Sequence, residues 1–382
     1  MRQFIIPIFI PYSGCPFRCI FCNQKRIAGE GSGVDIEDIK KTVDTWLSQS
    51  DLKNPRYKTA KDRQIAFYGG TFTALPLEKQ EAILSSVSRY LEDGVVDTVR
   101  VSTRPDRISP ENLAMLKRYR VRTVELGVQS MDSRVLSLSE RGYSADDVRN
   151  ACSLLKRYGF HMGIQIMTGL PGDTWNASLS TVDEVIKLRP DFVRIYPTIV
   201  IKNTRLADLY LSGSYKPLSL EDAVMLCKIL LMKLEFNNIP VIRIGLQPTP
   251  SLVERDVILG GPFHPALRQL VESEIAYDIM KCIIFTSQTA HPQEGCTVVR
   301  GQKSDHVTFF IPSMELSNFI GQKRVNIRRL NSEFNLDIHV RAGDRLKSGE
   351  VIFDNGYKKI YIERREFLEK ILPPYPQNAP PS

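Results

Sequence analysis

The N-terminal part of the chain carries the stretch Gly14-Cys15-Pro16-Phe17-Arg18-Cys19-Ile20-Phe21-Cys22-Asn23. Its three cysteines are separated by three residues and then by two. The apolar run before it, residues 4–11, predicts a buried strand, so we expect the cysteines to lie on a loop that follows this strand. Thiolates at this spacing can converge on one small metal–sulfur centre.

The number of cysteines narrows the kind of centre. Structural zinc takes four protein ligands, and an ordinary four-iron cluster takes four cysteines. The first histidine of the chain is His161, far from this stretch. Three thiolates on a four-iron cluster would leave one iron open to a substrate or cofactor. A zinc loop or three buried thiols is the alternative at this point.

The CxxxCxxC spacing, with Phe21 directly before the last cysteine, resembles the motif of the radical S-adenosylmethionine (radical SAM) superfamily. The resemblance implies a [4Fe-4S] cluster bound by Cys15, Cys19 and Cys22, with the amine and carboxylate of SAM on the open iron. It also implies that one electron from the cluster cleaves SAM to a 5′-deoxyadenosyl radical, so that the cofactor carries the difficult chemistry. An electron donor such as flavodoxin or ferredoxin is then expected as a partner.

Length and charge set the broad class. A chain of 382 residues predicts one large domain and one small one. Apolar residues make up 42% of the chain, which is ordinary for a globular protein. The net charge of +8 favours an anionic partner such as nucleic acid, and a generally basic soluble protein is the equal alternative. RNA is the expected partner, and no DNA is expected.

The chain has seven cysteines over its whole length, which is not a disulfide framework. Cys152, Cys227, Cys282 and Cys296 are scattered, and we expect them to be core thiols. No apolar run approaches the length of a membrane span, so no membrane partner is expected. The N-terminal run contains two prolines and leads into the cysteine stretch, so it is not a signal peptide. The expected location is cytoplasmic, where reducing conditions protect a cluster.

Strand and helix patterns alternate along the first two thirds of the chain. Predicted strands cover residues 64–68, 99–102, 123–127, 162–167 and 192–196, with a candidate seventh strand at 241–246. Predicted helices cover residues 36–46, 76–91, 144–158, 175–188 and 220–236, and another begins after Ser109. This alternation predicts parallel βα units. The units match the open six-stranded barrel of radical SAM enzymes, so we predict an α/β fold with a partial (β/α)6 barrel.

Glycine, proline or polar residues follow nearly every predicted strand, at the edge where such barrels bind ligands. Gly69 and Gly70 follow the strand at 64–68, and glycine lets the backbone approach a ligand closely. The resemblance implies that this stretch meets the amine of SAM. Thr71 stands where glutamate is frequent in the family, and a tight turn without a ligand is the alternative.

The next strand ends carry further candidate cofactor-binding residues. The resemblance assigns Ser102 and Arg104 to the carboxylate and ribose of SAM, and a guanidinium suits a carboxylate. It assigns Gln129 and Arg141 to further SAM contacts, and the Gly-Leu-Pro-Gly turn at residues 169–172 to the border of the adenine. Helix capping and ordinary surface polarity are the alternatives for these positions.

Residues 102–106, 125–130, 188–202 and 213–217 look like the radical SAM half of the catalytic subunit of the Elongator complex. That subunit is a tRNA wobble-uridine modifying enzyme, and the match covers roughly residues 5–280. The first two cysteines are closer together here, and no glycine-rich acetyl-CoA loop follows residue 281, so acetyl transfer does not carry over. Oxygen-independent coproporphyrinogen oxidases share the Gly-Val-Gln-Ser and Gly-Leu-Pro-Gly motifs more distantly.

We expect a barrel region at residues 1–285 and a separate small α+β domain at residues 295–345. Strand patterns in the small domain cover residues 297–299, 307–311 and 336–340. Residues 319–330 lie between them. The tail at residues 373–382 is rich in proline, which predicts disorder.

The stretch Ile320-Gly321-Gln322-Lys323-Arg324 looks like a KH module, whose Ile-Gly-x-x-Gly turn clamps a single-stranded nucleic-acid backbone. Arg324 replaces the second glycine, and its Cβ would crowd a close approach. The replacement adds charge, because the basic residues of this region then form a dense cluster that can meet RNA phosphates. The cluster comprises Lys323, Arg324, Arg328 and Arg329. A solvated basic helix face is the alternative.

Three functions compete at this point. The first is a radical SAM enzyme that modifies tRNA or rRNA, with the KH-like module presenting the RNA. The second is a radical SAM enzyme on a small molecule such as a tetrapyrrole, for which Tyr196 and Lys216 are the first residues to consider. The third is a non-catalytic RNA-binding protein on a radical SAM scaffold, which the intact cysteine triad disfavours. The sequence names no catalytic residue and no product.

Overall fold

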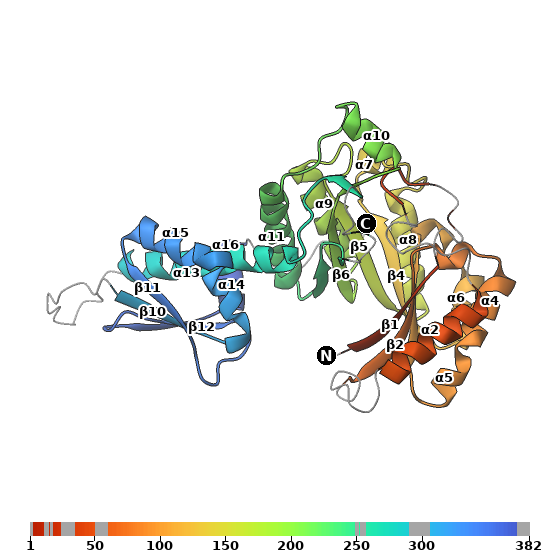
Figure 1. The fold of residues 1–382 in the computed structure, drawn as a ribbon, viewed down its shortest axis with the longest axis horizontal. Coiled ribbons are helices and arrows are strands. Elements are labelled where there is room, and N and C mark those ends of the chain that lie inside the picture. Colours follow the sequence, from red (N-terminus) through yellow and green to blue (C-terminus); the bar gives the residue numbers. More distant parts are fainter. Residues whose placement is uncertain are drawn as a thin grey trace. The chain divides into compact units, whose positions relative to one another are not determined.

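The fold of the computed structural model is drawn in Figure 1. The described residues are 3–10, 15, 18–23, 35–49, 60–248, 252, 257–289 and 306–372. The chain forms two compact units. The first comprises Met1–Ala223 and Ile239–Pro265, and the second comprises Val224–Asn238 and Ala266–Ser382.

A parallel sheet forms the centre of the first unit. Its strand order is β1-β2-β3-β4-β5-β6-β8, and each strand runs parallel to its neighbours. The strands are β1 (Gln3–Phe9), β2 (Asp62–Tyr68), β3 (Thr98–Thr103), β4 (Val121–Gln129), β5 (His161–Thr168), β6 (Phe192–Pro197) and β8 (Val241–Ile244). The sheet curls into an open half-barrel (Figure 1), which confirms the predicted partial barrel, and the candidate seventh strand is present as β8.

Helices connect the strands. They are α2 (Ile36–Gln49), α4 (Leu77–Ser86), α5 (Ser88–Glu92), α6 (Pro110–Arg118), α7 (Ser133–Leu138), α8 (Ala145–Arg157), α9 (Trp175–Lys187), α10 (Arg205–Leu211) and α11 (Leu220–Phe236), most of which belongs to the second unit. Helices α4, α6 and α8 lie along the outer face of the curled sheet, and α10 lies beyond the ends of the strands (Figure 1). The side chains of Asp35 and Ser109 accept hydrogen bonds from the backbone N–H groups of Glu37 and Asn112. These caps confirm two predicted helix starts.

The short elements differ most from the prediction. The helix predicted over residues 76–91 is two helices, α4 and α5, which meet at the buried Val87. The sequence pattern also does not predict α7, α10 or the antiparallel pair β7 (Val200–Ile201) and β9 (Ile258–Gly260). All four are shorter than the window of about 11 residues over which a hydrophobic period becomes visible.

Side chains of β1 alternate between the two faces of the sheet. Ile6 and Ile8 are buried in the core. Ile5, Pro7 and Phe9 line a cavity on the inner face of the half-barrel. Because one face of this strand packs in the core and the other lines the cavity, with only Phe9 exposed among the described side chains of β1, its sequence is a continuous apolar run rather than an alternation of apolar and polar residues.

The second unit contains a mixed four-stranded sheet in the order β11-β10-β12-β13. Strand β10 pairs in parallel with β11 and antiparallel with β12. The elements are α13 (Leu267–Thr289), β10 (His306–Ile311), α14 (Leu316–Ile320), α15 (Val325–Phe334), β11 (Asp337–Ala342), β12 (Glu350–Asp354), β13 (Lys359–Glu363) and α16 (Arg364–Ile371).

This unit is larger than the domain predicted at residues 295–345. It continues through β12, β13 and α16, and it also includes α13 and residues 224–238. The side chain of Arg364 explains part of the difference, because its guanidinium nitrogens lie 2.8 Å from carboxylate oxygens of Glu235 and of Glu272. An ion pair between residues so far apart in the chain leaves no local pattern in the sequence.

Several predictions fall outside the described residues, namely the strand at 297–299, the disordered tail at 373–382 and the core position of Cys296. Cys152 and Cys227 are buried, as predicted for core thiols, and Cys282 is half-buried. Burial raises the pKa of the Cys152 thiol to about 12. Within the described ranges, no helix has both the length and the apolar character needed to cross a membrane.

Gly163 tests the packing of the sheet. It pairs with Phe192 between β5 and β6, and a Cβ added at Gly163 would lie 2.3 Å from two ring carbons of Phe192. We expect Gly163→Ala to lower the free energy of unfolding by about 1–3 kcal/mol, as overpacking does in other cores. In a Phe192→Leu background the same change should be milder, because the ring is gone. Equal losses in both backgrounds, measured by urea unfolding, would contradict this packing.

Candidate functional site

A cavity of about 550 Å³ lies within the first unit, on the inner side of the half-barrel. All ten residues that the sequence assigns to the cluster and to the cofactor line it. These are Cys15, Cys19, Cys22, Gly69, Gly70, Thr71, Ser102, Arg104, Gln129 and Arg141. Residues from the ends of several strands therefore meet the cysteine loop around one space, although their roles stay predictions.

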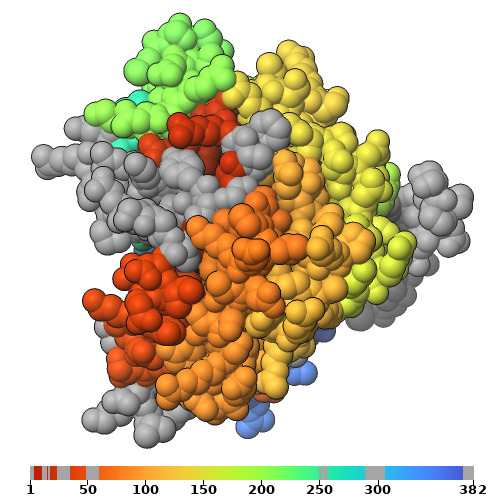
Figure 2. Space-filling view, turned by 90° about the vertical axis from the view of Figure 1, so that its right-hand side faces the viewer, coloured from red at the N-terminus to blue at the C-terminus, as the bar shows by residue number. Residues whose placement is uncertain are grey.

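The cysteine loop is held in place through Ile20. The Ile20 N–H donates to the Ser139 carbonyl over 3.4 Å, and the Ile20 carbonyl accepts from the Leu206 N–H over 2.9 Å. The Ile20 side chain is buried in a small apolar cluster with Val200 and Leu206. In Figure 2 the described part of this loop, in red, lies beside α10, in green. The sequence analysis did not anticipate this support from α10 and β7.

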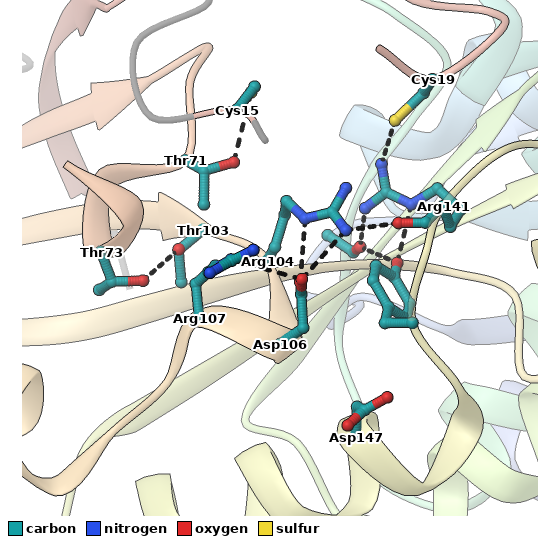
Figure 3. Close-up of polar contacts among 12 residues, drawn as sticks. Cys15, Cys19, Thr71, Thr73, Thr103, Arg104, Asp106, Arg107, Arg141 and Asp147 are labelled. Atoms are coloured by element: carbon teal, nitrogen blue, oxygen red, sulfur yellow. Dashed lines mark hydrogen bonds and ion pairs between the residues drawn. The ribbon is translucent and has the colours of Figure 1, made fainter. Parts of the chain in front are cut away.

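Polar side chains on the cavity wall contact the thiols of Cys15 and Cys19 (Figure 3). Cys15 Sγ lies 3.3 Å from Thr71 Oγ1. A guanidinium N–H of Arg141 donates to Cys19 Sγ over 2.8 Å. These contacts come from the loops after β2 and β4, which lie beside the loop after β1.

The Arg141 guanidinium is buried, and each of its three nitrogens donates a hydrogen bond to a protein group. It also donates to the Gly127 carbonyl over 2.7 Å and to the Tyr143 hydroxyl over 2.9 Å. Burial acts to lower the pKa of Arg141, but Tyr143 and the Cys19 sulfur outweigh it, so that the pKa is raised. Arg141 therefore links the Cys19 sulfur to Tyr143 and to the backbone of β4 at Gly127.

The spacing of the three sulfurs separates two kinds of metal centre. Tetrahedral zinc, with Zn–S bonds of about 2.3 Å, holds its thiolates about 3.8 Å apart. Among the described residues, one group of three ligand atoms lies mutually within 4.8 Å, and it comprises His306, Asp337 and His339. The three cysteine sulfurs therefore do not all lie within 4.8 Å of one another. Their number, three, also falls one short of the four protein ligands of structural zinc.

The loop after β2 brings backbone to the cavity. Gly69 has a φ of +99°, a conformation that glycine adopts without strain. Gly70 lines the cavity and is not among the described glycines with a positive φ. A side chain at Gly70 would therefore be tolerated by the backbone but would project at the edge of the space.

Arg104 lies after β3 and is held from below. Its guanidinium donates to the two carboxylate oxygens of Asp106 over 2.9 Å and 3.2 Å, and it also donates to the Arg141 carbonyl. Figure 3 shows Asp106 beneath Arg104 and Arg141 beside it. This network fixes the position of Arg104 at the cavity wall. Ser102, two residues earlier on β3, lines the same wall.

Gln129 ends β4 in an unusual conformation. Its φ is +64°, and the pairing of β4 with β5 is irregular between Gly127 and Gln129. The bulge turns the Gln129 side chain to the cavity, where its carbonyl oxygen accepts from Gln165 Nε2 over 3.1 Å. Gln165 is a lining residue that the sequence analysis did not name.

A buried charged group forms another part of the wall and was also missed. Glu125 lies 2.6 Å from an Arg100 guanidinium nitrogen and 3.0 Å from Arg194 Nε. Arg194 also reaches the hydroxyls of Tyr68 and Tyr196, each over 3.3 Å. Burial, and then the charge of Glu125, raises the pKa of Tyr68. The sequence did offer one sign of this group, because Glu125 and Arg194 are charged residues within strand patterns that are otherwise mainly apolar.

Of the two residues first considered for a small substrate, one lies at the cavity. Tyr196 lines it, whereas Lys216, which the structure also describes, does not. Residue 216 follows α10 on the segment that supports the cysteine loop rather than at a strand end.

The predicted basic cluster of the second unit is divided by the structure. Lys323, Arg324 and Arg328 are exposed at and after the turn between α14 and α15. Arg329 donates to Glu274 over 2.7 Å, and its guanidinium carbon lies 3.7 Å from the centre of the Tyr277 ring. Arg329 is therefore held against α13, whereas the other three side chains of the predicted cluster make no such contact within the described part of the chain.

The turn itself is tight. Gly321, Lys323 and Arg324 have φ values of +74°, +50° and +60°. Arg324 thus adopts the left-handed conformation for which a glycine is usual. The Arg324 Cβ is expected to crowd a close approach of nucleic acid to this turn. The positive φ of Arg324 adds local backbone strain at the same position.

Comparison with protein families gives two matches along the chain. The model of the radical SAM superfamily matches residues 9–185, and that of the radical SAM C-terminal domain matches residues 190–277. An uncharacterised protein of Methanocaldococcus jannaschii is 31% identical over 225 residues, which are 57% of this chain and 67% of that protein.

A tRNA uridine(34) acetyltransferase of Methanocaldococcus infernus is 30% identical over 181 residues, which are 42% of this chain and 34% of that protein. The chain thus spans about a third of the length of that relative. Among solved structures, the Elp3 of the same organism with residues 1–46 deleted matches with a TM-score of 0.55 and 21% identity, over 74% of this chain and 63% of that one. The fold, the cysteine triad and both family matches agree, and the chain belongs to the radical SAM superfamily.

Proposed function

We propose that this chain is a radical SAM enzyme that modifies RNA, with tRNA or rRNA as the substrate class. The observation that carries the enzymatic part is the meeting of Cys15, Cys19 and Cys22 with several strand ends around one cavity. In this proposal the three cysteines hold a [4Fe-4S] cluster, SAM lies in the cavity, and a donor such as flavodoxin or ferredoxin supplies the electron.

A cluster held by Cys15, Cys19 and Cys22 would, together with SAM, supply the radical chemistry of the reaction. The chain's own residues prepare the site. Arg141 positions the Cys19 side chain through its hydrogen bond to the sulfur. Thr71 fixes the position of Cys15. The apolar inner face of β1 excludes water from one side of the cavity, which protects a reactive species from side reactions.

The charge of the cavity suits an anionic ligand. Among the described residues that line it, five arginines stand against one acidic residue, Glu125. The arginines are Arg18, Arg104, Arg141, Arg194 and Arg243. A carboxylate such as that of SAM, or a phosphate, gains from such a field. Gly69, Gly70, Ser102, Arg104 and Gln129 are the residues that we assign to SAM.

The RNA part of the proposal rests on two further observations. The relatives include enzymes named tRNA uridine(34) acetyltransferase. From these names we infer tRNA as a substrate class for this chain, but we do not carry over the acetyl transfer. The exposed turn of the second unit presents Lys323, Arg324 and Arg328, and the chain carries a net charge of +8. Clustered cations on a turn between helices match the phosphate contacts that dominate nucleic-acid affinity.

Cys19→Ala tests the cluster ligands. Anaerobically reconstituted protein should bind about four irons per chain, and the variant should lose most of the iron together with SAM cleavage, because two thiolates cannot hold the cluster. Cys152→Ala, which removes a buried core thiol, is the matched control and should keep its iron. Full iron content in a folded Cys19→Ala chain would show that the ligands are assigned wrongly.

Gly70→Val tests the SAM wall. We expect normal iron content but weaker SAM binding, because the added side chain projects at the edge of the cavity while the backbone tolerates it. Gly70→Ala should give an intermediate affinity in calorimetric titration with SAM. Unchanged affinity in both iron-loaded variants would reduce this stretch to an ordinary turn.

The triple change Lys323→Ala, Arg324→Ala and Arg328→Ala tests the RNA contacts. Losing three phosphate contacts should lower the slope of log affinity against log salt by about 2 for single-stranded RNA. The charge-matched control removes three exposed lysines elsewhere on the second unit, Lys347, Lys358 and Lys370. SAM cleavage without substrate should be unchanged in both variants.

Modified nucleosides from total RNA give the readout in cells. A nucleoside that disappears with Cys19→Ala, and falls with the triple variant but not with its control, would match the proposal. Equal RNA affinity of the triple variant and its control, together with an unchanged nucleoside profile in Cys19→Ala cells, would contradict it and favour a small-molecule substrate.

A further inference from the structure

Three metal-binding side chains meet on the sheet of the second unit, far in sequence from the cysteines. His306 on β10 lies directly opposite Asp337 on β11 in the parallel pairing. His339 follows two residues after Asp337, so all three side chains point to the same face of the sheet. The side chains of Val307 and Phe309, which alternate with this face along β10, point to the opposite face of the sheet and are buried.

The ligand atoms of this group converge on one point. His306 Nδ1 and His339 Nε2 each lie 3.0 Å from the same atom, Asp337 Oδ2. All three atoms lie within 4.8 Å of one another, and the two imidazole rings are 4.3 Å apart. In a tetrahedral zinc site, with bonds of about 2.0–2.1 Å, neighbouring nitrogen and oxygen ligands are about 3.3 Å apart. A small opening of this group would therefore admit the ion.

The donor set and the exposure favour zinc among the biological cations. Two imidazole nitrogens and one carboxylate oxygen suit Zn²⁺ better than Ca²⁺ or Mg²⁺, which prefer oxygen alone. Hydrogen bonds from His339 and then His306 lower the pKa of Asp337, so the carboxylate is charged at neutral pH. All three side chains are partly exposed, which leaves room for water as a further ligand.

We propose that His306, Asp337 and His339 bind one Zn²⁺ ion. The ion would join the first residue of β10 to the start of β11 and so close the loop that contains α14, the basic turn and α15. Metal bridges across long loops stabilise by restricting the unfolded chain. The site therefore acts as a metal-dependent clip on the part of the second unit that carries Lys323 and Arg324. This inference does not depend on the function of the barrel.

The bland alternative is a hydrogen-bonded surface cluster in which both histidines donate to Asp337. A cluster of this kind would bind no metal, so adding zinc would not change the stability of the chain. His161 offers a comparison within the same chain, because its Nε2 lies 3.6 Å from Asp191 without a second histidine.

The test is a Co²⁺ titration of the full-length chain carrying Cys15→Ser, Cys19→Ser and Cys22→Ser, which serves as the parent chain because the cysteine loop can then bind neither cobalt nor iron. We expect about one Co²⁺ per chain, with visible d–d absorption bands but without the strong near-ultraviolet absorption of cobalt–thiolate bonds. Zn²⁺ should displace the Co²⁺ and should raise the unfolding temperature of the chain.

His339→Gln and Asp337→Asn should each lose the stoichiometric Co²⁺ bands and the zinc-dependent stabilisation, whereas His161→Gln should keep both. Circular dichroism shows whether each variant is folded, and the near-isosteric Asp337→Asn covers the case in which His339→Gln unfolds. Undiminished Co²⁺ binding in the two variants, or no Co²⁺ bands in the parent chain, would overturn the proposal. Thiolate–cobalt absorption in the parent chain would also overturn it, since the ion would then be bound by cysteine.

Discussion

All seven strands of the main sheet in the first unit run in one direction, and this constraint determines where the chemistry can be. Because the strands follow one another in chain order, the loops after β1, β2, β3 and β4 emerge side by side at one edge. The contact of Cys15 with Thr71 joins the first two loops, and the contact of Arg104 with the Arg141 carbonyl joins the next two. A parallel sheet thus converts a set of separate strand-end motifs into one continuous wall.

The cysteine loop depends on parts of the chain that come much later. Ile20 is hydrogen-bonded between Ser139 and Leu206, and Asn23 donates to the Lys202 carbonyl over 3.0 Å. Arg141 adds a further link, since its buried guanidinium donates a hydrogen bond to Cys19 Sγ. Changes in α10 or β7 are therefore expected to act on the metal centre through the position of the loop, although neither element lies at a motif.

Much of the first unit could be predicted because its signals are local. Apolar runs mark the strands, and Asp35 and Ser109 mark helix starts through contacts two or three residues away. The candidate cofactor residues could be placed together because most of them lie at or directly after the ends of β2, β3 and β4. The pairing of Glu125 with Arg194 was not predicted because it joins two different strands of the sheet. The predicted bounds of the small domain, residues 295–345, are narrower than the second unit, in which Arg364 binds Glu235 across a long separation in the sequence. The contact of Arg329 with Glu274 of another helix likewise spans a long separation.

The central claim is that three thiolates of this chain hold a four-iron cluster and leave one iron for SAM. Mössbauer spectroscopy of the full-length chain, reconstituted with iron-57 and recorded with and without SAM, tests it most directly. We expect about a quarter of the iron signal to shift when SAM is added, because one iron of four lacks a protein ligand. A spectrum in which SAM changes none of the iron, or in which the iron is mononuclear, would contradict the claim.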